Sequence, residues 1–499
     1  MQKFLFFLIG IGMSLSVYAN NIEVNNVTLT GQNQGDQFTL VQFDLSWENS
    51  WRISAGPSNY DGAWVFVKYR QNSGPWQHGT INYVNGTAAA DGHTAPSGAT
   101  IQTSSDGVGV WVYRDSDGSG DVNYQSIQLR WNYGSDGVSS SAVVDVQVFA
   151  IEMVNIPEGL FLLGSNNFGG DETDHFYYNT GVFGSQSPFP VTSEDAITVS
   201  NISGPTNLFY DIVATENQGD QLGPIPAEYP KGFAAFWVMK YEITEDQWLC
   251  FFNSLTDTQK DNHDVTDADH KNTDAVVSRN TIAYTSGNGT TLAPNRAISF
   301  LNYNDCAAYL DWTGLRFITE LEYEKASKGP VHVNNALATG GTAVFDELYN
   351  INNDGEADAI ITNPGENITN MCYFINDPGG PMRVGIFAAS AVNNTREETG
   401  GSYFGVMELS GNLYERCIGV GTPLNRGYEG THGDGELTFS GQHNVLTWPA
   451  PGSEGAHAYR GGSWSNDIGF CRTADRTSAC ILNSVTNSRI GLRGGRTAE

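Results

Sequence analysis

The 499-residue chain carries 55 Asp and Glu residues against 25 Lys and Arg residues, which gives a formal net charge of −30. This balance predicts no nucleic-acid partner and makes anionic membranes poor partners, because both require clustered Lys and Arg. The length exceeds one ordinary hydrophobic core and predicts two or three domains.

Residues 1–19, "MQKFLFFLIGIGMSLSVYA", combine one lysine, an apolar run and a small-residue end. This pattern predicts a secretory signal peptide that is cleaved near Ala19. Since no later run is long enough to span a bilayer, we expect a secreted protein in the periplasm, at the cell surface or outside the cell. Six cysteines permit disulfides there without fixing their pairing.

Residues 20–150 are predicted to form an all-β sandwich domain. The segments "VQFDLSW" (41–47) and "SIQLRWNY" (126–133) alternate apolar and polar residues, and turn residues lie between such runs. Six of the 11 tryptophans fall in this domain. Core packing explains tryptophans on an alternating face better than a carbohydrate-binding platform does.

The segment "DSDGSGD" (115–121) resembles the start of a calcium-binding loop. The twelfth position of that loop is Ser126, where an EF-hand requires a bidentate glutamate. The sequence therefore predicts a glycine-rich hairpin turn at this place.

From residue 151 onward, short strands, three helices and long loops are expected. "TEDQWLCFFNSL" (244–255) and "TELEYEKASKG" (319–329) both open with a capping box, and "NYNDCAAYLDWTG" (302–314) has one apolar helical face. The aperiodic segments 166–230, 256–295 and 330–405 are predicted loops, which a compact domain must hold in place by other contacts.

Six segments then follow one another in a specific order. They are "MVNIPEGLFLLGS", "FWVMKYEITEDQWLCFFNSL", "RAISFLNYNDCAAYLDWTGLRFITELEYEKASKG", "GVMELSGNLYE", "YRGGSWSNDIGFCRTADR" and "SRIGLRGGR". This order resembles the formylglycine-generating enzyme family, also called the sulfatase-modifying factor domain, whose fold is a variant of the C-type lectin fold. The predicted fold class is therefore α+β, with the β-sandwich followed by a loop-rich domain of this kind over residues 151–499.

The resemblance implies calcium at "ELSGNLYE". Two carboxylates seven residues apart around a tight turn supply hard oxygens, and the family's calcium ligands match the Glu408 and Glu415 side chains and the Gly411 and Leu413 carbonyls. A surface turn with two exposed glutamates is the alternative. A second calcium site would use Asn370 and the Met371 carbonyl.

The oxidases of this family hold copper between two thiolates five residues apart, after a Gly-Gly-Ser turn. The matching positions here are Asn466 and Cys471. Copper(I) prefers soft sulfur ligands and an amide cannot replace a thiolate, so we expect no copper and no oxidase centre. Cys471 would be catalytic only under the oxidase interpretation, and a structural disulfide through it is an alternative.

The pocket that remains would bind a ligand through Ser463, Trp464, Asn466 and Asp467, unless these residues only cap the core. The sequence favours a secreted, calcium-stabilised binding or surface protein, not an enzyme, with a protein, peptide or glycan as ligand. Three alternatives stay open. The chain could be a formylglycine-generating oxidase acting on sulfatase cysteines, a component of a surface or gliding assembly, or a binding protein diversified by a retroelement within residues 465–493.

Overall fold

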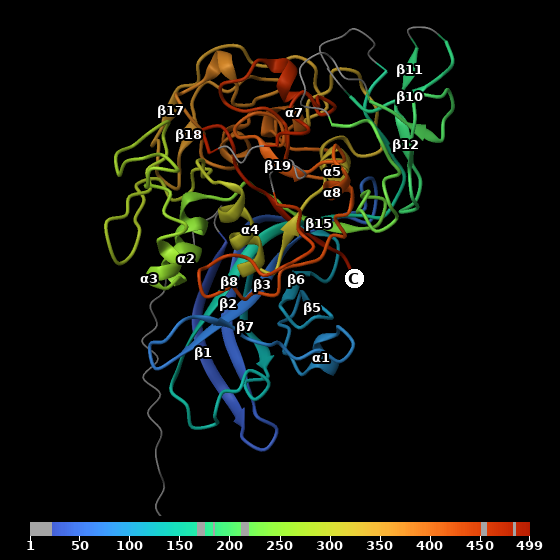
Figure 1. Cartoon of the computed structure of the whole chain (residues 1–499). Coiled ribbons are helices and arrows are strands. Elements are labelled where there is room, and N and C mark those ends of the chain that lie inside the picture. Colours follow the sequence, from blue (N-terminus) through green and yellow to red (C-terminus); the bar gives the residue numbers. More distant parts are fainter. Residues whose placement is uncertain (1–21, 167–174, 183–184, 211–218, 451–456, 483–485) are drawn as a thin grey trace, which may run out of the picture. The chain divides into compact units, whose positions relative to one another are not determined.

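The fold is mixed, rich in strands and poor in helices, as the predicted α+β class requires (Figure 1). The predicted signal peptide, residues 1–19, lies outside the residues that the structure describes. Within the described part, no helix is both long and apolar enough to cross a membrane. The structure is a computed structural model that describes residues 22–166, 175–182, 185–210, 219–450, 457–482 and 486–499.

Contacts divide the chain into two compact units, and the divisions fall inside the strands Phe38–Arg52, Asp61–Gln71 and Val144–Ile156. The first unit contains the chain up to Trp51 together with Gly62–Ile151. The second contains Arg52–Asp61 and Glu152–Glu499. The short segment Arg52–Asp61 therefore packs with the second unit although it precedes most of the first in sequence.

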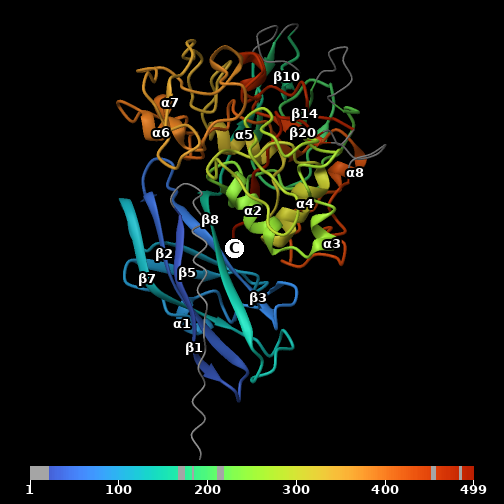
Figure 2. The same cartoon turned by 90° about the vertical axis from the view of Figure 1, so that its left-hand side faces the viewer.

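A three-stranded sheet forms one side of the first unit. Its strand order is β1-β2-β7, and β1 and β2 pair in antiparallel register with Val24 opposite Leu45 (Figure 2). The predicted alternation is confirmed, because Val41, Phe43 and Leu45 are fully buried while the residues between them are partly exposed. The three strands are β1 (Glu23–Asn33), β2 (Phe38–Arg52) and β7 (Gly118–Trp131).

A second sheet of this unit shares its hydrophobic core with the first. Core residues come from both sheets and include the tryptophans Trp47 and Trp131, so packing explains these side chains. The strand order is β8-β3-β6-β5, with β4 paired to β3. The elements are β3 (Asp61–Gln71), β4 (Gln77–His78), α1 (Ala88–Asp91), β5 (Ala99–Thr103), β6 (Val110–Arg114) and the first part of β8 (Val144–Ile156).

The predicted hairpin turn at residues 115–121 is wrong. The strand before it, β6, belongs to the second sheet, and the strand after it, β7, belongs to the three-stranded sheet. The segment carries the chain from one sheet to the other. A turn-rich composition indicates that the chain changes direction, but it does not predict which strands will pair.

The sheet of the second unit includes the C-terminal strand. Strand β21 lies between β15 and β16, and β15 also pairs with the last residues of β8, all antiparallel. A side chain at Gly494 would place its Cβ 2.5 Å from Leu310, so glycine allows this strand to lie close to the helix beneath it. The strands are β15 (Phe236–Met239), β16 (Arg316–Phe317) and β21 (Gly494–Thr497).

All three predicted helices are confirmed. Thr244 and Thr319 each form a capping box with the residue three positions later, as the sequence predicts. Gly314 and Gly329 follow the ends of their helices with positive φ. The helices are α2 (Glu245–Ser254), α4 (Tyr303–Trp312) and α5 (Glu320–Lys328).

The rest of the second unit consists of loops with short elements, so the predicted long loops are confirmed where the structure describes them. Five strand pairs are β9 (Phe161–Leu163) with β12 (Phe189–Val191), β10 (Tyr178–Asn179) with β11 (Gln186–Ser187), β13 (Thr198–Val199) with β14 (Asn207–Leu208), β17 (Ile351–Asn352) with β18 (Ile360–Ile361), and β19 (Glu415–Ile418) with β20 (His457–Arg460). The short helices are α3 (Asp257–Lys260), α6 (Ile386–Ser390), α7 (Arg396–Thr399) and α8 (Pro423–Arg426), with 3₁₀ turns at Phe374–Asn376 and Ile468–Cys471.

Candidate functional site

Two motifs that lie about fifty residues apart in sequence form one site. The amide of Gly411 donates to the carbonyl of Gly461 at 2.8 Å, and the amide of Trp464 donates to the carbonyl of Asn412 at 2.8 Å. The amide of Asn412 in turn donates to the carbonyl of Cys372. One hydrogen-bonded centre therefore joins residues 408–415, residues 460–464 and the loop at Cys372.

Glycines allow the close approach of these segments. Gly462 has a φ of 68°, and a Cβ at this position would lie 2.6 Å from the sulfur of Cys471. Gly461 has a φ of 85°, and its Cβ would lie 2.7 Å from the carbonyl oxygen of Leu409. Both conformations are in the left-handed region that favours glycine, so the Gly-Gly pair is required for the turn as well as for the contact.

Ion pairs anchor the loop between Arg460 and Arg476 to α5 at both of its ends. Arg460, at the end of β20, pairs with Glu324 at 2.7 Å and with Glu320 at 3.1 Å. Arg476 pairs with the same Glu320 at 2.7 Å. All four side chains are inaccessible to solvent, so the loss of Glu320 would remove the buried carboxylate that both arginines share.

Cys471 is a buried, neutral thiol. Burial raises the pKa of the Cys471 thiol to about 12, far above the range in which a thiolate forms at neutral pH. Its sulfur donates weakly to the carbonyl of Asp467 at 3.7 Å, and its own carbonyl accepts from the hydroxyl of Ser410 at 2.8 Å. Its apolar neighbours are Leu337, Met371, Tyr373, Val344 and Ile468.

Asn466, which the sequence motif matches to a thiolate position, is held by hydrogen bonds. The hydroxyl of Ser463 donates to the amide oxygen of Asn466 at 2.5 Å, and the carbonyl of Asn466 accepts from the amide of Phe374 at 3.1 Å. An amide oxygen fixed by a hydroxyl is a hard, neutral group, which does not suit copper(I).

The structure brings the four predicted ligand-binding residues to one loop but places them differently. Ser463 is fully buried, whereas Trp464 is half-buried with its ring nitrogen donating to the carbonyl of Ser488 at 2.8 Å. Asn466 is partly exposed and Asp467 is exposed. Asn466 and Asp467 are accessible to a partner, and ligand binding by the four residues stays a prediction.

The other thiols bear on the copper and disulfide predictions. All six cysteines are free thiols, so the structure contains no disulfide through Cys471. Cys480 lies against Gly421 and forms no disulfide with Cys471. Burial raises the pKa of Cys372 well above its usual value, and the neighbouring Asp377 and Cys471 add to the rise.

The predicted calcium ligands lie in a buried acidic cluster that also contains Glu242 and Arg493. Glu415 pairs with Arg493 at 2.8 Å, and Glu408 accepts from the amide of Gly385 at 2.8 Å. The second carboxylate oxygens of Glu408 and Glu415 are buried and have no hydrogen-bond partner among the described residues. The alternative of exposed surface glutamates is wrong, because both side chains are buried.

Burial controls the ionisation of this cluster. It raises the pKa of Glu408 to about 7, and the charge of Arg493 partly offsets the rise. Burial and the neighbouring Glu415 raise the pKa of Glu242 well above its usual value. Glu242 accepts from the amide of Leu413 at 2.9 Å, so this acid holds the predicted calcium-binding turn in place.

Asn370 is used to fix loops. Its amide oxygen accepts from the amide of Gly365 at 2.8 Å and from the hydroxyl of Tyr349 at 3.2 Å. Its amide nitrogen donates to the carbonyls of Gly365 and Glu398. The same tyrosine donates to the Met371 carbonyl at 3.4 Å. A calcium ion at the predicted second site would have to replace these hydrogen bonds.

Sequence reasoning missed Glu242, Arg493 and the pair Arg460–Arg476. Glu242 lies 166 positions before Glu408, so no local spacing connects the two acids. The arginines stand inside the matched motifs, and charged residues inside glycine-rich, otherwise apolar segments are a signal for buried ion pairs. Within the described residues, no group of three or more His, Cys, Asp or Glu side chains is arranged to hold a metal ion.

Comparison with known proteins places this site in a family. Residues 146–498, more than half of the chain, match the family described as the sulfatase-modifying factor enzyme 1-like domain. No curated protein matches the chain. Among solved structures, the chain is similar to Treponema denticola variable protein 1, with 14% sequence identity over 70% of this chain and 96% of that chain and a TM-score of 0.33. The match over residues 146–498 shows that this chain belongs to the sulfatase-modifying factor enzyme 1-like family.

Proposed function

We propose that this chain is a secreted binding or surface protein whose sulfatase-modifying-factor domain lacks the copper oxidase centre. One observation carries the proposal. The position of the first family thiolate holds Asn466, whose amide oxygen is bound by Ser463, and the remaining Cys471 is a neutral buried thiol. Oxidation through copper needs two sulfur ligands that deprotonate, and this pair supplies one.

We propose for the two units the folds that the sequence predicts. We infer that the two sheets with a shared core in the first unit form a β-sandwich, and that the second unit has a C-type-lectin-like fold. The ligand would contact Asn466 and Asp467, which are the accessible members of the predicted set. A protein, a peptide or a glycan fits the polar character of these groups.

Calcium is the cofactor of this proposal. The unpartnered oxygens of Glu408 and Glu415 are two hard donors, whereas calcium takes about six to eight oxygens, so the carbonyls of Gly411 and Leu413 and water would supply the rest. Calcium bound there would neutralise two buried carboxylates and hold the turn that carries Gly411 against the Gly461 turn. The positive charge of Arg493 opposes it and limits its affinity.

Titration with copper(I) against a competing chelator tests the loss of the oxidase centre. We expect the wild-type protein to bind copper(I) no more tightly than Cys471→Ser, because one thiol is insufficient. Asn466→Cys should gain tight binding, since it restores the second thiol five residues before Cys471. Tight stoichiometric binding by the wild type that is lost in Cys372→Ser would show a copper site between Cys372 and Cys471 and would refute the proposal.

A further inference from the structure

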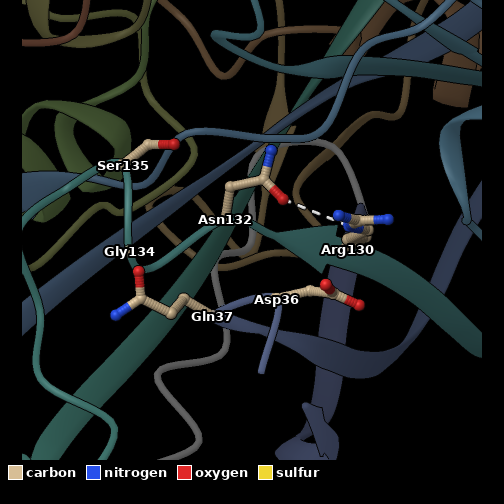
Figure 3. Close-up of a pocket in the computed structure, with 6 residues that line it drawn as sticks. All are labelled: Asp36, Gln37, Arg130, Asn132, Gly134 and Ser135. Atoms are coloured by element: carbon tan, nitrogen blue, oxygen red, sulfur yellow. Dashed lines mark hydrogen bonds between the residues drawn. The ribbon is translucent and has the colours of Figure 1, made fainter. Parts of the chain in front are cut away.

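An open polar pocket lies in the first unit, outside the residues that match the family. Two turns form it, one between β1 and β2 and the other after β7 (Figure 3). Its wall is polar, because carboxylate, amide, guanidinium and hydroxyl groups supply almost all of its surface. The lining residues are Asp36, Gln37, Arg130, Asn132, Gly134 and Ser135.

Contacts between the two turns fix the shape of the pocket. The amide of Gly134 donates to the carbonyl of Gln37 at 3.0 Å. A Cβ at Gly134 would lie 2.5 Å from the Cβ of Gln37, so only glycine permits the contact. The side-chain oxygen of Asn33 accepts from the amides of Gly35 and Asp36 at 2.9 and 3.0 Å, which fixes the first turn. A pre-formed pocket loses little conformational entropy on binding.

Arg130 is held so that the end of its guanidinium group is available. Its guanidinium carbon lies 4.1 Å from the centre of the Phe38 ring, and its Nε donates to Asn132 at 3.1 Å. Its backbone amide donates to His93 at 3.0 Å. The two terminal nitrogens have no hydrogen-bond or ion-pair partner in the part of the chain that the structure describes.

The end of a guanidinium group presents two parallel N–H donors, which match the two oxygens of a carboxylate. Around it, the amides of Gln37 and Asn132 and the hydroxyl of Ser135 can donate and accept hydrogen bonds. The Asp36 carboxylate accepts only, which suits the hydroxyls of a sugar and repels a ligand with several negative charges.

We propose that this pocket binds a saccharide that carries one carboxylate, of the uronic acid type. The carboxylate pairs with the terminal nitrogens of Arg130, and the sugar hydroxyls bond to Asp36, Gln37 and Ser135. This inference does not depend on the function of the second unit. If the copper proposal were refuted, the saccharide proposal would still stand. If the saccharide proposal were refuted, the copper proposal would still stand.

Calorimetry on the full-length protein with methyl galacturonoside and methyl glucuronoside tests the proposal. At least one uronoside should bind, while the matching neutral glycoside and acetate should each bind at least about tenfold more weakly, a loss of about 1.4 kcal/mol. Equal binding of acetate would mean that the pocket recognises a carboxylate alone. Equal binding of the neutral glycoside would remove the role of Arg130. Either result overturns the proposal, as does the absence of binding by both uronosides.

Variants separate the pocket from the rest of the unit. Arg130→Gln should abolish binding, and Arg130→Lys should weaken it, because lysine keeps the charge but lacks the paired donors. Arg70→Gln is the matched control, since Arg70 also stacks on an aromatic ring, at 4.7 Å from Trp76, but already pairs with Asp145. If Arg130→Gln does not fold, the exposed Ser135→Ala provides a second test with an expected weakening. Unchanged uronoside affinity in the folded pocket variants would contradict the site.

Discussion

At the scale of single residues, burial keeps the His93 ring of the first unit neutral, and its hydrogen bonds determine which ring nitrogen carries the proton. Its Nδ1 accepts from the amide of Arg130, which leaves the Nε2 hydrogen to donate to the hydroxyl of Thr103 at 3.0 Å. Burial lowers the pKa of His93 to about 4, so the ring is neutral at neutral pH. Protonation of Nδ1 would remove the acceptor on which Arg130 depends.

We expect acid to destabilise the protein through His93. The folded-state pKa lies below the unfolded value of about 6.5, so stability from this group is complete above pH 6.5 and is lost as the pH falls through 4. The full loss amounts to about 3 kcal/mol. Urea unfolding between pH 7.5 and 4 measures it, with His93→Gln as the non-titrating control. Parallel pH profiles of the two proteins would contradict this account.

A second residue-scale prediction concerns Gly462. Gly462→Ala should destabilise the second unit by about 2 to 4 kcal/mol, since it adds left-handed strain and forces a Cβ to 2.6 Å from the Cys471 sulfur. Gly287→Ala is the matched control, with a φ of 74° and no atom within 4 Å of the added Cβ. Denaturant unfolding compares the two. Equal losses would show that strain alone matters and that the contact with Cys471 does not.

At the scale of elements, a buried carboxylate fixes the long loop of residues 256–295 to α4. Asp305, in the first turn of α4, accepts from His263 and from His270, both at 2.8 Å. The other nitrogen of His263 faces the carbonyl of Gly441 at 2.9 Å, and the other nitrogen of His270 faces Asp267 at 2.6 Å. The sequence predicted that this loop must be held in place, and these two histidines supply contacts that do so.

This loop should loosen as the pH rises. Burial alone would lower the pKa of His270, but its hydrogen bonds to the Asp305 and Asp267 carboxylates, together with their charges, raise it to about 9. A raised histidine pKa contributes stability that is complete below about 6.5 and is lost as the pH increases through 9. Hydrogen exchange of residues 256–295 should therefore accelerate from pH 7 to 9.5 after correction for the intrinsic rate.

The control for this prediction is His270→Asn, in which the loop should exchange faster at pH 7 and show little further change at pH 9.5. Exchange in β2, which belongs to the separate hydrophobic core of the first unit, should be the same in both proteins. A loop that stays equally protected across the pH range in the wild type would show that the histidine pair does not hold it.

At the scale of the whole molecule, calcium should stabilise the second unit. Calcium at ten times its dissociation constant contributes about 1.4 kcal/mol by mass action, so chelation should lower the melting temperature of that unit by a few degrees. Glu408→Gln should remove the response, because it replaces a buried carboxylate oxygen by an amide without breaking the Glu415–Arg493 pair. Identical melting curves with calcium and with chelator would remove calcium from the account.

The sequence predicted those features that local chemistry determines. Capping boxes at Thr244 and Thr319 predicted two helices, and alternation predicted the buried faces of β2 and β7. Motif order predicted the family and the segments of the site. Features that depend on distant segments had no local signal in the sequence. Examples are the crossover from β6 to β7 and the approach of Glu242 to Glu415. Such features depend on packing between distant segments, which the spacing of residues within one segment does not determine.

The loss of the copper oxidase centre is tested most directly by measuring whether an aldehyde forms on a cysteine-containing sulfatase peptide. Purified full-length protein would be incubated with copper(I), oxygen and the peptide, and the product measured by mass spectrometry and by aldehyde-specific labelling. If Asn466 stands in the place of a thiolate, as we propose, the wild type should give the same absence of product as Cys471→Ser. Turnover by the wild type that disappears in Cys471→Ser would show a working oxidase and contradict the account.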